Sequence, residues 1–84
     1  MPEEWQLRAH PEFTSSLYRV PRGAAAILTQ AIEGLRYNPT PENSTPVINR
    51  PGRYELHAAD YVVVYRVEEA ERIIRLFWVE PEAE

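Results

Sequence analysis

Two apolar runs dominate the second half of the chain. The first, ADYVVVYRV, spans residues 59–67, and the second, RIIRLFWVE, spans residues 72–80. The short charged stretch EEAE at 68–71 separates them. Apolar runs of this kind, rich in β-branched and aromatic residues and joined by a few polar ones, are typical of antiparallel strands. The pattern therefore predicts a β-hairpin at the centre of a sheet.

The turns of this predicted sheet fix which side chains share a face. A tight turn at Ala59-Asp60 sets Leu56 opposite Val63. The same turn sets Tyr54 opposite Tyr65. Because side chains alternate, one face is apolar throughout, and we expect it to receive the helices. A loop at Glu68 to Glu71 completes that face by setting Tyr65, Val63 and Tyr61 beside Ile74, Leu76 and Trp78.

The first half of the chain has the pattern of one strand and two helices. Residues 5–9 alternate between apolar and polar side chains, which predicts a short strand with one buried face. A helix is predicted over residues 11–20, with a proline in its first turn and another proline after it. A broad apolar stripe predicts a second helix over residues 21–37. Residues 38–52 carry four prolines and several turn-forming polar residues, so we expect a loop that crosses from the helices to the sheet.

The other face of the predicted sheet has mixed chemistry. It combines arginines, a carboxylate, an imidazole and apolar groups: Arg53, Glu55, His57, Val62, Val64, Arg66, Ile73, Arg75 and Phe77. This mixture is too polar for a second core and too apolar for an ordinary solvated surface. We interpret it as a binding face with Val62, Val64 and Phe77 as apolar contacts. The alternative is a solvated face whose apolar members are merely good strand formers, with Glu55 pairing Arg75 for little net stability.

One constellation on this face is a candidate for chemistry. Arg53, Arg66 and Arg75 are suited to holding a phosphate, and His57 is a candidate general acid or base beside them. A lone histidine on a sheet face is more often a surface residue, and an arginine at a strand edge commonly serves solubility. His10 has no partner at a metal-ligand spacing, and no glycine-rich loop is present to cradle a phosphate. We expect neither a metal nor a cofactor.

Composition narrows the class of protein. The 84 residues suffice for a single domain (residues 1–84) with one small core. A net charge of −4 gives no general attraction to nucleic acid or anionic membranes, so contact with RNA needs a local basic patch. The absence of cysteine fits a reducing compartment, and no stretch resembles a signal peptide or a membrane span. We expect a cytoplasmic protein without a membrane partner and with an acidic tail at 80–84.

The segment GRYELHAADYVVVYRVEEAERIIRLFWVE at 52–80, together with the order strand, helix, helix and three strands, resembles the RelE/ParE toxin superfamily of type II toxin–antitoxin systems. The sequences of its members typically contain, in order, a tyrosine, an alternating basic run, a glycine-aspartate turn, the motif YRVVY, a short acidic turn and a last strand. AIEGLRYNP at 31–39 is similar to the end of the family's second helix. The resemblance implies an α+β fold, RelE-like β-α-α-β-β-β, with a helical hairpin packed on one face of a four-stranded, mainly antiparallel sheet. The residues that fall on the family pattern are Tyr54, Leu56, Asp60, Tyr61, Val63 and Tyr65.

Departures from the family pattern bear on activity. In RNA-cleaving members, basic side chains on the sheet hold the scissile phosphate, and a late tyrosine or histidine helps with proton transfer. The corresponding basic positions are Glu55 and His57 here, and Val62 replaces the arginine after the tyrosine of YRVVY. The basic C-terminal segment is replaced by the largely acidic residues 79–84. The resemblance therefore implies that RNA cleavage by the usual mechanism is lost.

Three functions stay open from the sequence. The favoured one is a toxin-fold protein, degenerate as an RNase, that binds an antitoxin-like protein on its sheet and helical hairpin. The second is a ribosome-dependent mRNA endoribonuclease with a displaced site at Arg53, His57, Arg66 and Arg75. The third is a gyrase inhibitor, like the other branch of the superfamily. Aromatic candidates for protein contact are Trp5, Tyr18, Tyr37, Tyr61, Phe77 and Trp78.

Overall fold

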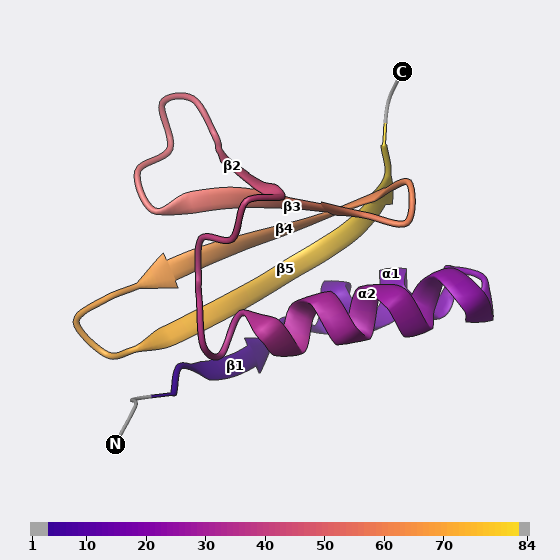
Figure 1. Cartoon of the computed structure of the whole chain (residues 1–84), viewed down its shortest axis with the longest axis horizontal. Coiled ribbons are helices and arrows are strands. Elements are labelled where there is room, and N and C mark those ends of the chain that lie inside the picture. Colours follow the sequence, from indigo (N-terminus) through magenta and orange to yellow (C-terminus); the bar gives the residue numbers. More distant parts are fainter. Residues whose placement is uncertain (1–3, 83–84) are drawn as a thin grey trace.

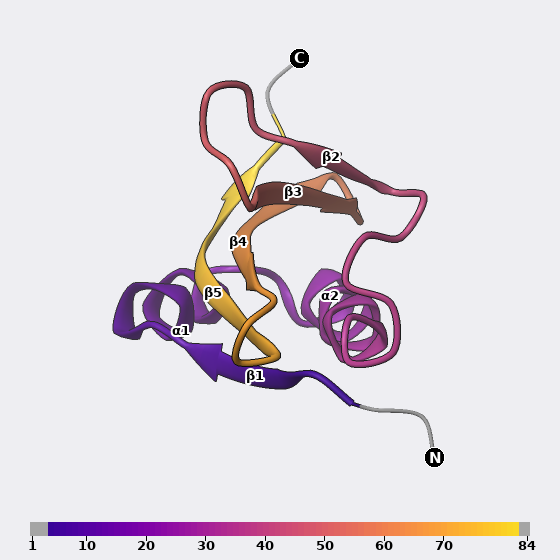
Figure 2. The same cartoon turned by 90° about the vertical axis from the view of Figure 1, so that its left-hand side faces the viewer.

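The computed structural model describes residues 4–82 as two helices and a five-stranded sheet (Figure 1). The strands lie in the order β1-β5-β4-β3-β2, with β1 parallel to β5 and the other pairs antiparallel (Figure 2). This confirms the expected α+β class and helical hairpin, although the sheet has five strands rather than four. In chain order the elements are β1 (Gln6–Ala9), α1 (Pro11–Tyr18), α2 (Arg22–Gly34), β2 (Ser44–Pro46), β3 (Arg53–Ala58), β4 (Tyr61–Glu68) and β5 (Ile73–Pro81).

Both helices share one core with one face of the sheet. Figure 1 shows the two helices beneath the twisted sheet. Phe13 of α1 and Leu28 of α2 are buried in one cluster with Leu56, Val63 and Ile74 of the central strands. Burial of these apolar groups is the main force that holds the layers together. The expectation that this face receives the helices is confirmed.

Each helix ends earlier than its apolar pattern predicts. α1 ends at Tyr18, ahead of the proline expected to stop it, and α2 ends at Gly34 rather than Tyr37. The chain beyond α2 continues in tighter turns, in which the Leu35 N–H donates to the Ile32 carbonyl at 3.0 Å. Such bonds satisfy carbonyls at a helix end without extending the helix.

The hairpin between β3 and β4 has the predicted register. Leu56 lies opposite Val63, and Tyr54 lies opposite Tyr65. Ala59 and Asp60 form the two-residue turn with φ of 54° and 66°. Both values lie in the left-handed region, as a type I′ turn requires, and that turn matches the twist of the strands.

The predicted register between β4 and β5 is wrong. Tyr65 is expected beside Ile74 but pairs with Leu76, a shift of two residues that still leaves Ile74 and Leu76 on the core face. Val64 then pairs with Trp78, so Phe77 is an extra residue that bulges from β5. Because one extra residue reverses the alternation, Trp78 turns to the face opposite the helices. Val79 takes the core position that the sequence pattern assigns to Trp78.

The segment at 38–52 does more than cross between layers. Its residues Ser44–Pro46 form β2, which pairs with β3 and adds the fifth strand at the edge of the sheet. The buried hydroxyl of Tyr65 donates to the Pro39 carbonyl at 2.7 Å and ties the start of the segment to β4. This strand has no clear sequence signal, because β2 is short and contains a proline.

The C-terminal segment is also partly a strand. β5 runs through Pro81, which pairs with Tyr61, so the first residues of the acidic tail belong to the sheet. Residues 83–84 of the tail lie outside the described residues. Between residues 4 and 82, no helix has the length and hydropathy to cross a bilayer.

Candidate functional site

Four arginines lie side by side across the sheet face that points away from the helices. Arg53 of β3 pairs with Arg66 of β4, Arg66 pairs with Arg75 of β5, and Arg75 pairs with Arg8 of β1. We call these four residues the arginine row. The structure thus brings together the three arginines that the sequence singled out. It adds Arg8, which sequence reasoning missed because the parallel pairing of β1 with β5 has no local signal.

His57 lies away from the arginine row. It pairs with Val62 on β4, four residues along β3 from Arg53. Four residues of a strand span about 13 Å, so the imidazole does not join the arginines around one phosphate. The predicted clamp of three arginines with an adjacent histidine is therefore not assembled.

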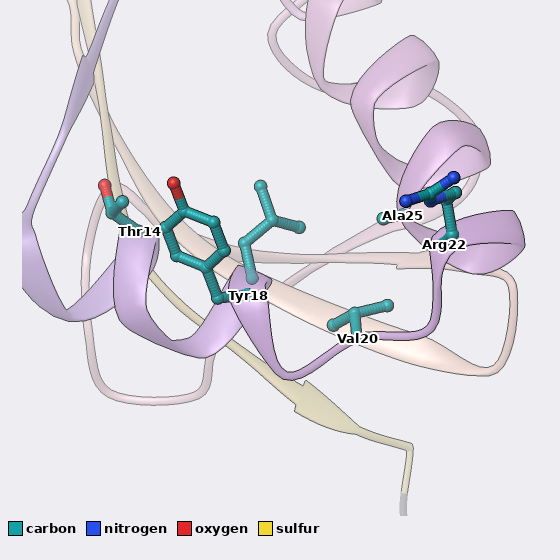
Figure 3. Close-up of a pocket in the computed structure, with 6 residues that line it drawn as sticks. Thr14, Tyr18, Val20, Arg22 and Ala25 are labelled. Atoms are coloured by element: carbon teal, nitrogen blue, oxygen red, sulfur yellow. The ribbon is translucent and has the colours of Figure 1, made fainter.

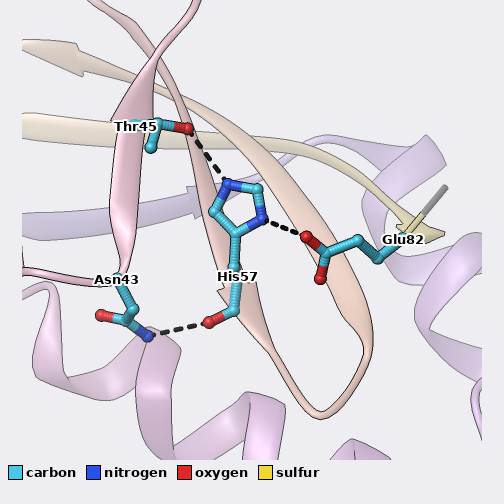
Figure 4. Close-up of polar contacts among 4 residues, drawn as sticks. All are labelled: Asn43, Thr45, His57 and Glu82. Atoms are coloured by element: carbon cyan, nitrogen blue, oxygen red, sulfur yellow. Dashed lines mark hydrogen bonds and ion pairs between the residues drawn. The ribbon is translucent and has the colours of Figure 1, made fainter. Parts of the chain in front are cut away.

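The imidazole of His57 already has two partners (Figure 4). Its Nε2 lies 3.0 Å from the Thr45 hydroxyl of β2, and its Nδ1 lies 3.0 Å from a carboxylate oxygen of Glu82. The backbone around it is fixed as well, since the Asn43 side chain donates to the His57 carbonyl at 3.0 Å. This chain of contacts links β2, β3 and the C-terminal segment, and both ring nitrogens are engaged in it.

The guanidinium groups of the arginine row have different partners. The Arg75 guanidinium donates to the Glu68 carboxylate at 2.7 Å. Among residues 4–82, Glu68 is the only residue whose carboxylate forms an ion pair with an arginine of the row. Arg8 donates to the neutral amide of Gln6 at 2.8 Å. Arg53 stacks over the Phe77 ring at 4.8 Å. Small hollows flank the row at both ends, one between Arg53 and the β2–β3 loop and one between Arg75 and β1.

The three residues expected to offer apolar contacts differ in exposure. Val62 and Val64 are only 6% and 4% exposed. Larger cross-strand neighbours flank them, such as His57 beside Val62 and Trp78 beside Val64. Phe77 is half-buried beneath the Arg53 guanidinium. The sheet face is therefore less apolar at its surface than its sequence suggests.

An apolar groove lies elsewhere, where α1 meets α2 (Figure 3). Its volume is about 670 Å³, and it is lined by Thr14, Leu17, Tyr18, Val20, Arg22 and Ala25. We call it the hairpin groove. Tyr18 is 86% exposed at its edge, which leaves a large aromatic ring in contact with water. Aromatic side chains in this setting are enriched at protein interfaces.

The remaining aromatic candidates divide between core and surface. Trp5 is buried beneath the Arg72 guanidinium, and Tyr61 packs against the core. Tyr37 is exposed just beyond α2. Tyr65 is fully buried, and burial raises its pKa to about 12, so it stays protonated at neutral pH. Residues 4–82 contain no cluster of three histidine, aspartate or glutamate side chains placed to hold a metal ion.

The sequence family that matches this chain is described as the ParE toxin of the type II toxin–antitoxin system parDE, and the match spans residues 6–84. The chain belongs to the ParE toxin family, within the RelE/ParE superfamily. No functionally curated protein has a significant sequence match to it.

Solved structures support this membership at the level of the fold. The archaeal RelE–RelB complex of Pyrococcus horikoshii contains a chain that is 17% identical, with a TM-score of 0.85 over 96% of this ParE-family chain and 98% of the other. The RelBE2 toxin–antitoxin complex of Mycobacterium tuberculosis matches at 16% identity and a TM-score of 0.80, covering 94% and 99% of the two chains. The isolated RelE toxin of E. coli matches at 13% identity and a TM-score of 0.83, covering 95% and 86%.

Proposed function

We propose that this chain is the toxin component of a type II toxin–antitoxin pair and that it acts by binding proteins rather than by cleaving RNA. The observation that carries this proposal is the hairpin groove with the exposed Tyr18 at its edge. Solved relatives with the same fold were captured as complexes with RelB antitoxins. An antitoxin-like partner for this chain is therefore the expected occupant of its helical hairpin.

The hairpin groove suits a segment with apolar side chains. Leu17, Val20 and Ala25 offer aliphatic surface, and Tyr18 adds an aromatic ring that is solvent-exposed in the free chain. Covering such surface with an amphipathic helix is favourable at about 25 cal/mol per Å² of apolar area. Helix-in-groove recognition needs this combination of shape and apolar lining.

The positions that the family resemblance assigns to RNA cleavage do not carry the side chains that cleavage needs. Glu55 brings a negative charge where a phosphate would need a positive one. Val62 is apolar and buried, and both nitrogens of His57 are engaged by Thr45 and Glu82. A proton-transfer group must reach the substrate to act, and this imidazole would first have to leave two partners. These features favour a protein that does not use the usual cleavage mechanism.

A displaced-site mRNA endoribonuclease is the second candidate. The alignment of Arg53, Arg66 and Arg75 on adjacent strands favours it, because neighbouring guanidinium groups attract phosphate. If the chain is a toxin that binds a protein target, DNA gyrase is the first target to test, because the other branch of the superfamily inhibits gyrase. Inducing the chain alone in bacteria separates the cases, since arrest with intact mRNA indicates a protein target.

The binding proposal is tested with the product of the gene beside this one, which the proposal expects to encode the antitoxin. Both proteins are purified and their affinity is measured by calorimetry. Tyr18→Glu places a charge in the hairpin groove and should weaken binding by about tenfold or more. Tyr37→Glu makes the same change at an exposed tyrosine outside the groove and should leave affinity unchanged. Equal affinity of both variants and the original chain would refute the assignment of the groove.

A further inference from the structure

The arginine row is a strained arrangement of charge. Like charges directly opposite each other on neighbouring strands destabilise a sheet. The row contains such contacts at Arg53 with Arg66, at Arg66 with Arg75 and at Arg75 with Arg8. Among the described residues, Glu68 alone pairs a carboxylate with any of these four guanidinium groups. An external anion would relieve the repulsion along the rest of the row.

The spacing of the row indicates what kind of anion fits. Adjacent strands lie about 4.8 Å apart, so the three steps from Arg8 to Arg53 span about 14 Å. Glutamates at positions i, i+4, i+7 and i+11 of a helix lie on one stripe and span about 16 Å. Neighbouring members of that stripe are about 5 to 6 Å apart. A helix that crosses the strands therefore presents carboxylates at nearly the interval at which the strands place the four arginine residues.

The geometry at Arg75 shows how a carboxylate binds to this face. Its Nε donates to the Glu68 carboxylate at 2.7 Å, a short contact typical of a charge-assisted hydrogen bond. A single-stranded nucleic acid, in contrast, needs open aromatic faces on which bases stack. The aromatic ring within the row, Phe77, is already covered by the Arg53 guanidinium. The row thus offers charge without a stacking platform.

From these observations we infer that the arginine row binds an acidic helical segment of a protein partner, with its carboxylates aligned along Arg8, Arg75, Arg66 and Arg53. The inference rests on the proposed function, because it describes a second contact of the same antitoxin-like partner. The hairpin groove and the arginine row lie on opposite sides of the sheet layer, so a partner that uses both must wrap around the sheet.

Two synthetic helical peptides of identical composition test the inference on the intact chain. One carries four glutamates on a single stripe, and the other has the same glutamates spread around the helix. Fluorescence anisotropy should show the striped peptide binding at least about fivefold more tightly, because only its carboxylates meet the row together. Equal affinity for the two peptides would overturn the inference.

Matched arginine variants locate the site. Arg66→Ala removes the exposed centre of the row and should weaken binding of the striped peptide by about tenfold. Arg19→Ala removes the same charge at the exposed turn between the helices and should change affinity by less than about twofold. An Arg66→Ala variant that keeps full affinity, or a short single-stranded RNA that binds the row more tightly than the striped peptide, would overturn the inference.

The same measurements separate this inference from the proposed function. Tyr18→Glu alters the hairpin groove and should leave peptide binding unchanged. If the natural partner binds in a groove-dependent way while the striped peptide does not bind, the arginine row is wrongly assigned and the proposed function stands. If the striped peptide binds at Arg66 while the partner ignores the groove, the groove assignment that carries the proposed function fails instead, and the arginine row stands.

Discussion

Replacing Tyr65 by phenylalanine tests the role of the hydroxyl that joins the sheet to the crossing segment. Tyr65 is fully buried, and its hydroxyl donates to the Pro39 carbonyl at 2.7 Å. Phenylalanine preserves the ring, including its stacking on Tyr54 at 5.8 Å between centroids. The Pro39 carbonyl loses its donor, so Tyr65→Phe should lower the free energy of unfolding at pH 7 by about 1 to 2 kcal/mol.

The same hydroxyl makes stability depend on pH in the alkaline range. Burial raises the pKa of Tyr65 from its ordinary value near 10 to about 12 in the folded chain. A raised pKa means that the stabilising contribution is complete below pH 10 and is lost as the pH rises toward 12. Between these values, the free energy of unfolding should fall by about 1.4 kcal/mol per pH unit on account of Tyr65.

Urea unfolding of the original chain and Tyr65→Phe at pH 8, 10 and 11 measures both effects. All other ionisable groups are common to the two proteins, so the difference between their free energies of unfolding isolates Tyr65. We expect the stability gap between them to shrink as the pH rises past 10, by about 1.4 kcal/mol at pH 11. A gap that stays constant from pH 8 to pH 11 would refute the burial argument.

Three further substitutions, two of them with a matched control, test the fold by thermal or urea unfolding. Gly52→Ala should destabilise the chain by about 1 kcal/mol or more, because Gly52 has φ of +83° and an added Cβ would lie 3.3 Å from a backbone oxygen of β4. The control is Gly23→Ala, where an added Cβ meets nothing within 4 Å; this change in a helix should stabilise the chain by up to about 1 kcal/mol. Ala59→Gly should stabilise by about 1 kcal/mol, because Ala59 holds a left-handed φ of 54° that glycine adopts without strain; an unchanged midpoint would contradict this. Leu28→Ala should cost about 2 to 5 kcal/mol at a fully buried site, while Ile27→Ala on the exposed side of the same helix should cost far less.

Local pattern predicted the parts of the fold that depend on neighbouring residues. The register of β3 with β4 followed from the turn at Ala59-Asp60 and from the alternation of apolar side chains. The bulge at Phe77 could not be read from the sequence, because either register leaves a run of apolar residues facing the core. The strand at Ser44–Pro46 is held by pairing with β3 rather than by its own propensity.

The candidate site was partly predictable for the same reason. Arg53, Arg66 and Arg75 sit on strands whose faces the alternation determines, and the structure places them together. Arg8 joins them only through a parallel contact between distant segments. The engagement of His57 depends on Glu82, which the curvature and length of β5 bring close from the other end of the chain.

The chemistry of the sheet face bears on the proposal that this ParE-family chain acts by binding proteins. Its positive charge is concentrated on the arginine row, and its histidine is tied to a hydroxyl and a carboxylate some distance away along β3. Cleavage of RNA requires phosphate binding and proton transfer at one place. A face that separates the two functions is better suited to recognition than to catalysis.

Incubation of the purified chain with ribosomes that are translating a defined mRNA tests most directly whether the chain cleaves RNA. The 5′ ends of the mRNA are then mapped by primer extension, with an active endoribonuclease of the superfamily as positive control. We expect full-length mRNA at every ratio of protein to ribosome. Cleavage of the ribosome-bound mRNA that disappears when Arg53, Arg66 and Arg75 are all replaced by alanine would contradict it.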